Sequence, residues 1–166
     1  MRNKKKIEQR KGFLIKRTNE AEVIYLELVK ELEQCFLGFD EILDKYDLEK
    51  IKTIGDAYMC AGGLPTENNT HTEDAFSAAQ EILAFVKETQ DNPPNGIYPF
   101  EVRIGINTGP VVAGVVGTKK FQYDIWGNTV NIAARMESNS VSGKINVSEN
   151  TFQQLKDKHH FSYRGE

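Results

Sequence analysis

Asn131 and Arg135 have types and a spacing that could serve anion chemistry. They lie four positions apart in a segment whose apolar residues predict a helix from about 130 to 138, so both side chains project from one helix face. An amide and a guanidinium on one face can converge on a single anion, because both present N–H donors and the guanidinium is always charged. The alternative is a surface arginine beside an asparagine that caps a turn.

Lys52 and Asp124 form a second candidate pair. Each lies in a predicted strand between apolar neighbours, and the two carry opposite charges. Such a pair could read the edge of an adenine, with the ammonium donating to a ring nitrogen and the carboxylate accepting from the exocyclic amino group. The alternative is a simple ion pair.

Asp56 follows Gly55 in a predicted tight turn between two apolar strands. The missing side chain at Gly55 would let a ligand or an ion approach the backbone beside the carboxylate. The alternative is an aspartate that only stabilises the turn through local hydrogen bonds.

The elements that must position these residues follow from the apolar pattern. A three-to-four-residue repeat predicts a long amphipathic helix over 19–46, and Thr72 is expected to cap a second helix. Turn residues at 107–110 predict a hairpin between the strands on either side. Trp126 is expected in the core. The order of helices and strands predicts an α+β sandwich. The predicted strands cover 48–54, 57–61, 102–106, 111–116, 121–126 and 144–147, and a last short helix runs from the cap Ser148 to about 156.

Composition narrows the class of protein. With a formal net charge of −3, 39% hydrophobic residues and 27% charged residues, the chain has the composition of a soluble globular protein and gives no reason to expect nucleic-acid binding. Cys35 and Cys60 are set among apolar residues and are expected to be buried, reduced thiols. No stretch is long and apolar enough for a membrane span. We therefore expect a cytoplasmic location for this segment, although a longer parent protein can still carry a membrane anchor.

Three sequence blocks carry a family resemblance. LEKIKTIGDAYMCAGGLP at 48–65, VRIGINTGPVVAGVVG at 102–117 and FQYDIWGNTVNIAARMES at 121–138 closely resemble, in order and spacing, the catalytic domains of class III adenylyl and guanylyl cyclases. The resemblance extends from about 26 to 166. It implies a ferredoxin-like, βαββαβ-type fold, with a mostly antiparallel sheet, helices on one face and a small αβ appendage.

The resemblance also implies roles for the candidate residues. Asp56 matches the second of the two aspartates that hold paired Mg²⁺ or Mn²⁺ ions. Asn131 and Arg135 match the asparagine that orients the ribose and the arginine that stabilises the pentavalent phosphorus. Lys52 and Asp124 match the adenine-selecting pair, where guanylyl cyclases usually have Glu and Cys. The expected reaction is therefore the conversion of ATP to cyclic AMP and pyrophosphate.

In this family, one site takes its metal-binding residues from one subunit and its Asn/Arg pair from the other. The resemblance therefore implies a head-to-tail homodimer, or a heterodimer with a related cyclase domain. A homodimer could build two equivalent sites, and an isolated monomer could build none.

The sequence departs from the family pattern at both ends. Gln9 stands where the first metal aspartate belongs and cannot supply a negative charge. The chain stops before the strand whose lysine contacts the triphosphate. We expect residues 1–18 to be a basic segment that is poorly ordered or a substitute strand, and 19–166 to be an incomplete catalytic domain. The alternatives are a cyclase-like module that binds nucleotide or a partner without turnover, and a guanylate cyclase.

Overall fold

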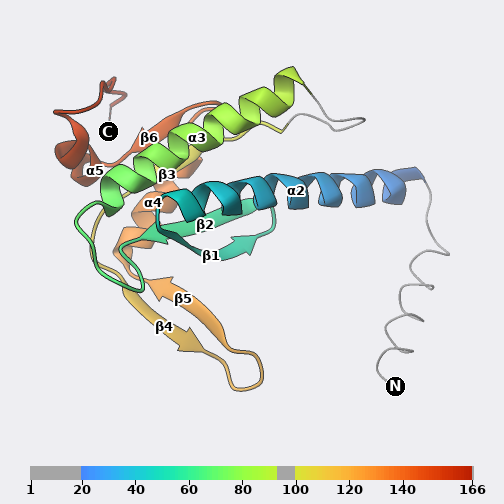
Figure 1. Ribbon diagram of the computed structural model, residues 1–166, viewed down its shortest axis with the longest axis horizontal. Coiled ribbons are helices and arrows are strands. Elements are labelled where there is room, and N and C mark those ends of the chain that lie inside the picture. Colours follow the sequence, from blue (N-terminus) through green and yellow to red (C-terminus); the bar gives the residue numbers. More distant parts are fainter. Residues whose placement is uncertain (1–19, 93–99, 166) are drawn as a thin grey trace.

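The computed structural model describes residues 20–92 and 100–165, with the backbone alone for 20–27 (Figure 1). The expected α+β class is confirmed, because four helices and six strands follow one another along the described chain. The N-terminal segment 1–18 lies outside the described residues. The elements are α2 (Glu20–Lys45), β1 (Leu48–Ile54), β2 (Ala57–Gly62), α3 (His71–Asp91), β3 (Ile104–Ile106), β4 (Val112–Val116), β5 (Gln122–Trp126), α4 (Asn128–Ser138), β6 (Ile145–Val147) and α5 (Glu149–Leu155).

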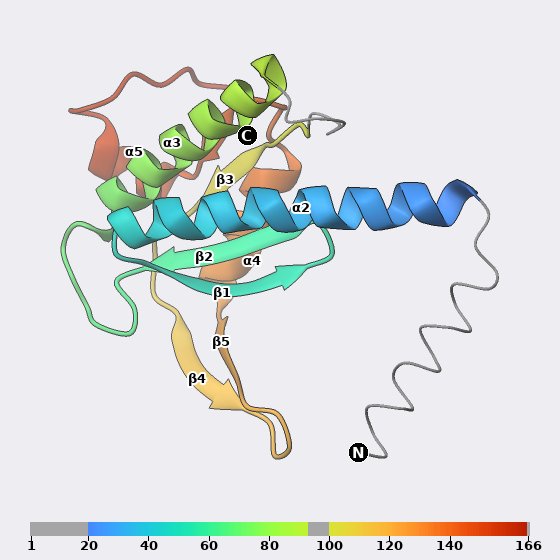
Figure 2. The same ribbon diagram turned by 45° about the vertical axis from the view of Figure 1, so that its right-hand side comes forward.

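The main core lies where α2 and α3 pack against the β1–β2 hairpin (Figures 1 and 2). Apolar residues three and four apart on each helix form one stripe, and the two stripes meet over the sheet. Burial of this apolar surface is the main force that holds the two helices on the strands. The buried cluster comprises Cys35, Phe39, Ile42 and Leu43 of α2, Leu48 of β1, and Ala78, Ile82 and Val86 of α3.

The first predicted hairpin is confirmed. β1 and β2 pair antiparallel, with Ile54 opposite Ala57 across the turn. Gly55 adopts a φ of +62°, which favours glycine because it has no Cβ. Asp56 therefore lies exposed at the hairpin tip, as predicted.

The second predicted hairpin is wrong. β3 pairs in parallel with β6, and β4 pairs antiparallel with β5, so the strands on either side of 107–110 do not pair with each other. The polar residues of that connection serve tertiary contacts: the Thr108 hydroxyl lies 3.0 Å from that of Thr151. Turn composition alone could not reveal that use.

The two predicted helix caps have different outcomes. Ser148 caps α5 as expected, since its hydroxyl accepts a hydrogen bond from the N–H of Thr151. Thr72, by contrast, is a buried residue within the first turn of α3, and its hydroxyl donates to Gln154 at 2.7 Å. The side chain of Asn68 instead accepts from the N–H of His71 at 2.8 Å.

The β4–β5 hairpin projects away from the rest of the molecule in both views (Figures 1 and 2). Its apolar side chains are largely exposed, including Phe121 in the loop at 78% and Val115 at 62%. Trp126 is 40% exposed, so its expected place in the core is wrong. Cys35 is buried as expected, whereas Cys60 is exposed, and both thiols are free.

Among the helices that the structure describes, none has the length and apolar character required to cross a bilayer.

Candidate functional site

Lys52 and Asp124 meet where β1 lies against β5. The Lys52 Nζ is 2.6 Å from Asp124 Oδ2, and Asp124 is a buried residue. The other carboxylate oxygen of Asp124 accepts from the N–H of Ile125 at 2.9 Å. The hydrogen bond from Lys52, followed by that from Ile125, lowers the pKa of Asp124 below its ordinary value of 3.8. The structure therefore holds an ionised carboxylate and an ammonium side by side.

An irregularity in β1 turns the Lys52 side chain toward Asp124 on β5. The register shifts between Lys50 and Lys52, so Ile51 is an extra residue in the strand. Leu48 and Ile51 are both buried although they are three positions apart, which a regular strand with its two-residue period would not allow. Lys52 follows Ile51 and so points to the opposite face, away from the core and toward β5.

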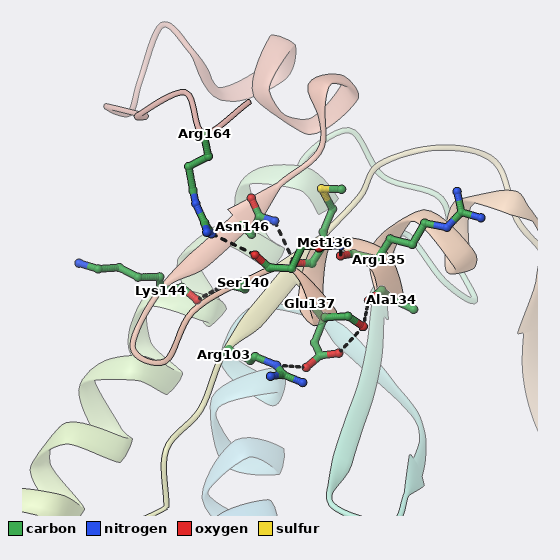
Figure 3. A network of polar contacts seen from close by, with 11 residues as sticks. Arg103, Ala134, Arg135, Met136, Glu137, Ser140, Lys144, Asn146 and Arg164 are labelled. Carbon is green, nitrogen blue, oxygen red and sulfur yellow. Dashed lines mark hydrogen bonds and ion pairs between the residues drawn. The ribbon is translucent and has the colours of Figure 1, made fainter. Parts of the chain in front are cut away.

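Asn131 and Arg135 lie on α4, as predicted, and both are exposed. The helix starts at Asn128, immediately after Gly127, whose φ of +141° is accessible chiefly to glycine. Figure 3 shows the Arg135 side chain extending away from the polar network at the end of α4. Its backbone carbonyl accepts from the Asn139 amide at 2.8 Å, while the guanidinium stays available to an external anion.

Asp56 stands at the hairpin tip with no hydrogen bond or ion pair to any other described residue. A Cβ built on the neighbouring Gly55 meets nothing within 4 Å, so the space beside the carboxylate is open. No group of three or more His, Cys, Asp or Glu side chains gathers as a metal site in the described part of the chain. Asp56 is thus suited to contribute one ligand to a cation that takes its other ligands elsewhere.

Of the five candidate residues, the structure brings Lys52 and Asp124 into direct contact within the described part of the chain. Helix α4 packs against β3, β5 and β6, and it follows β5, the strand that carries Asp124, directly in the chain. The β1–β2 hairpin packs against α2, α3 and β5. Within the described part of the chain, no hydrogen bond or ion pair joins Asp56 to Asn131 or Arg135.

Asn107 makes a contact with α4 that its place in a predicted turn does not suggest. Asn107 is half-buried, and its side-chain amide donates to the carbonyl of Thr129 in the first turn of α4 at 2.9 Å. The available signal was an asparagine that directly follows an apolar strand. Polar residues at the carboxyl end of a strand often face a ligand or an adjoining element.

Comparison with known proteins places these features in a family. The family model for the adenylate and guanylate cyclase catalytic domain matches residues 12–166. An adenylate cyclase of Mycobacterium bovis is 40% identical over 139 residues, which cover 84% of this chain and 31% of that protein. Guanylyl cyclase C of Homo sapiens is 44% identical over 132 residues, which cover 79% of this chain and 12% of that protein. The chain therefore spans less than a third of the length of these two relatives.

Solved structures agree with the fold. The catalytic core of a rhodopsin-guanylyl cyclase with converted specificity, in complex with ATPαS, is 34% identical with a TM-score of 0.73, covering 89% of this chain and 76% of that one. The adenylyl cyclase CyaB from P. aeruginosa is 27% identical with a TM-score of 0.72, covering 89% of this chain and 75% of that one. The α+β arrangement is thus the class III nucleotidyl cyclase fold. This chain belongs to the adenylate and guanylate cyclase catalytic domain family.

Proposed function

We propose that this chain is an adenylate cyclase catalytic domain, which converts ATP to 3′,5′-cyclic AMP and pyrophosphate for intracellular signalling. The observation that carries the proposal is the Lys52–Asp124 pair, held at 2.6 Å between β1 and β5. Family membership supports a nucleotidyl cyclase, and relatives of both the adenylate and the guanylyl kind are found. The choice of base therefore rests on the side chains of this chain.

The base edge explains why we favour ATP. Adenine presents an exocyclic amino donor beside a ring-nitrogen acceptor, which complement a carboxylate and an ammonium respectively. Guanine presents an acceptor and a donor in the reverse order, so the same pose would place its carbonyl oxygen against the Asp124 carboxylate. A site whose polar groups pair with one base edge rejects a base that leaves those groups unpaired.

Asn131 and Arg135 act on the rest of the nucleotide in this proposal. The Asn131 amide orients the ribose so that its 3′-hydroxyl faces the α-phosphorus in line with the departing pyrophosphate. Arg135 places its permanent charge where negative charge develops on the phosphoryl oxygens. Both side chains are exposed on one helix face, which leaves room for a nucleotide.

Divalent cations, Mg²⁺ or Mn²⁺, would supply the charge that activates the 3′-hydroxyl and neutralises the triphosphate. Asp56 fits one ligand of such an ion, since Mg²⁺ is commonly bound by one or two carboxylates together with substrate phosphates. Among the described residues, no cluster of three or more His, Cys, Asp or Glu side chains forms a metal site.

A second copy of this chain is the proposed partner, in a head-to-tail dimer. Five exposed apolar residues gather on the projecting β4–β5 hairpin, and soluble monomers seldom leave such a surface uncovered. A dimer would also supply what one chain lacks, namely an Asp56 near the Asn131 and Arg135 of the other subunit. A heterodimer with a related cyclase domain is the alternative. The exposed residues are Val112, Val115, Val116, Phe121 and Trp126.

The test is turnover with each nucleotide. The purified chain is incubated with ATP or GTP and MnCl₂ or MgCl₂, and cyclic AMP and cyclic GMP are quantified, with Arg135→Ala as the catalytic control. We expect cyclic AMP from ATP, reduced about 100- to 1,000-fold in the variant. Cyclic GMP as the main product would overturn the base preference.

A second candidate function is a module that binds nucleotide or a partner subunit without turnover. The observation that favours it is Gln9, which stands where the family resemblance places the first metal aspartate and cannot supply a negative charge. Saturable binding of an ATP analogue with no product from either nucleotide would support it and would contradict the adenylate cyclase proposal.

A further inference from the structure

We propose that Asn107 and Asn146 are positioning residues, which together clamp α4 and set the rotation that points Asn131 and Arg135 outward. The two asparagines form what we term the asparagine clamp. This inference rests on the proposed function, because it concerns the aim of the two residues that would act on the nucleotide.

The two asparagines of the clamp bind α4 by hydrogen bonds at two points on one face of the helix. Asn107 donates through Nδ2 to the carbonyl of Thr129, and Asn146 donates through Nδ2 to the carbonyl of Met136, both at 2.9 Å. Figure 3 shows the second of these bonds. Thr129 and Met136 are seven residues apart, which is about two turns of an α-helix, so the two carbonyls lie on the same side of it.

The β3–β6 ribbon presents both asparagines to that side. The two strands pair in parallel with Gly105 opposite Asn146, and Asn107 follows β3 directly. A Cβ built on Gly105 would lie 2.0 Å from the Glu137 nitrogen and 2.6 Å from the Ala133 carbonyl oxygen. The absence of a side chain therefore lets the helix sit directly on the ribbon, within reach of both amides.

Asn131 and Arg135 occupy the opposite face of α4. At about 100° per residue, Thr129, Ala133, Met136 and Glu137 fall within one sector, and Asn131 and Arg135 fall on the far side of the helix axis, about 180° away. A helix fixed at two points two turns apart cannot rotate about its axis. The clamp thus determines the direction in which the two active side chains project.

The orientation of the Asn107 amide is itself fixed. The Ser148 hydroxyl donates to Asn107 Oδ1 at 2.6 Å, so the amide nitrogen is the group left to face the helix. Ser148 is buried, and its oxygen in turn accepts from the N–H of Thr151 at the start of α5. The clamp is therefore tied to α5 by a directional chain of hydrogen bonds.

The test replaces donors by acceptors of nearly the same shape. Asn107→Asp and Asn146→Asp each put a carboxylate oxygen against a helix carbonyl, which repels it. Thr72→Val is the matched control: it removes the hydroxyl that bonds to Gln154 in the same polar region, and this hydroxyl does not touch α4. All three variants are compared for melting temperature, kcat and KM, at a temperature where each is folded.

We expect kcat for cyclic AMP formation to fall about 10- to 100-fold in the two asparagine variants, with KM for ATP changed by about threefold or less. Thr72→Val is expected to lose thermal stability while its kcat stays within about twofold of the original chain. If the asparagine variants lose no more kcat than Thr72→Val, their role is only structural and the inference is wrong.

A second readout does not depend on activity. Hydrogen exchange of the peptide that covers 128–138 is measured without nucleotide, and we expect it to be faster in Asn107→Asp and Asn146→Asp than in Thr72→Val. If the unaltered chain makes no cyclic nucleotide, the proposed function fails while this exchange still decides the clamp. Unchanged exchange in both asparagine variants overturns the clamp. If Asn107→Asp does not fold, Asn107→Ala is measured in its place with the same expectation.

Discussion

Lys52 and Asp124 are 72 residues apart in the sequence, yet their charged atoms lie 2.6 Å apart between β1 and β5. The pair connects the hairpin that ends in Asp56 to the strand that leads into α4. In the proposed function these two side chains read the base, and β5 leads directly into the helix that carries Asn131 and Arg135.

The base preference is expected to depend on this pair. Lys52→Glu combined with Asp124→Cys should lower turnover of ATP about 100-fold or more, because neither new side chain complements the adenine edge. The ratio of cyclic GMP to cyclic AMP, measured with both nucleotides, should rise. Lys50→Glu is the matched control on the same strand, since Lys50 is bound to Asp40 at 2.8 Å. An equal loss in that control would contradict a base-reading role.

Acid should weaken the fold through Asp124. Its pKa is held below 3.8 in the folded chain, so the stability that its charge contributes is complete above that pH and is lost as the pH falls through the folded pKa. Asp124→Asn should therefore have a lower urea midpoint than the original chain at pH 6, and the difference should shrink below pH 3.8. A difference that stays constant down to pH 3 would refute this linkage.

Gly105 is expected to tolerate no side chain. The atoms that a Cβ would meet belong to the backbone of α4, so the helix itself must move. Gly105→Ala should cost about 1–3 kcal/mol in the free energy of unfolding and should also reduce cyclase activity. Gly114→Ala is the control, because its Cβ would meet a Trp126 ring carbon at an ordinary 3.6 Å. Equal stability of the two variants in urea titrations would disprove the close packing of α4.

The β4–β5 hairpin is expected to form part of the dimer interface. Val115→Glu places a charge on an exposed apolar strand and should convert a dimer into a folded, inactive monomer in sedimentation experiments. Val141→Glu changes a valine that is 49% exposed but lies outside the hairpin, and it should leave the dimer intact. Persistence of the dimer in Val115→Glu would exclude this hairpin as the interface.

The local elements could be predicted from the sequence because their signals are local. The long helix of α2, the Gly55–Asp56 hairpin and the α4 helix all follow from apolar periodicity and turn residues within the segment itself. All five candidate residues lie on the elements expected for them. The class III cyclase fold was likewise identified from the three sequence blocks.

The failures concern contacts between distant segments. The 107–110 segment has the composition of a turn, but its side chains bind α4 and α5, so β3 pairs with β6 instead of β4. Thr72 has the chemistry of a helix cap but is used in a buried hydroxyl network. Trp126 is a large aromatic residue of the kind that is usually buried, yet it lies exposed on the projecting hairpin. Contacts between distant segments determine where such residues lie, and these contacts have no signal in the local sequence pattern.

Mixing two inactive variants tests most directly whether the site is shared between two copies of this chain. Asp56→Ala and Arg135→Ala are each expected to be inactive alone, because every site of such a dimer lacks one essential group. After subunit exchange, half of the dimers contain one of each variant, and each of these has one intact site. The account predicts about a quarter of the original cyclic AMP activity in the mixture. If mass spectrometry shows that mixed dimers have formed and the mixture is still as inactive as its two components, the account is contradicted.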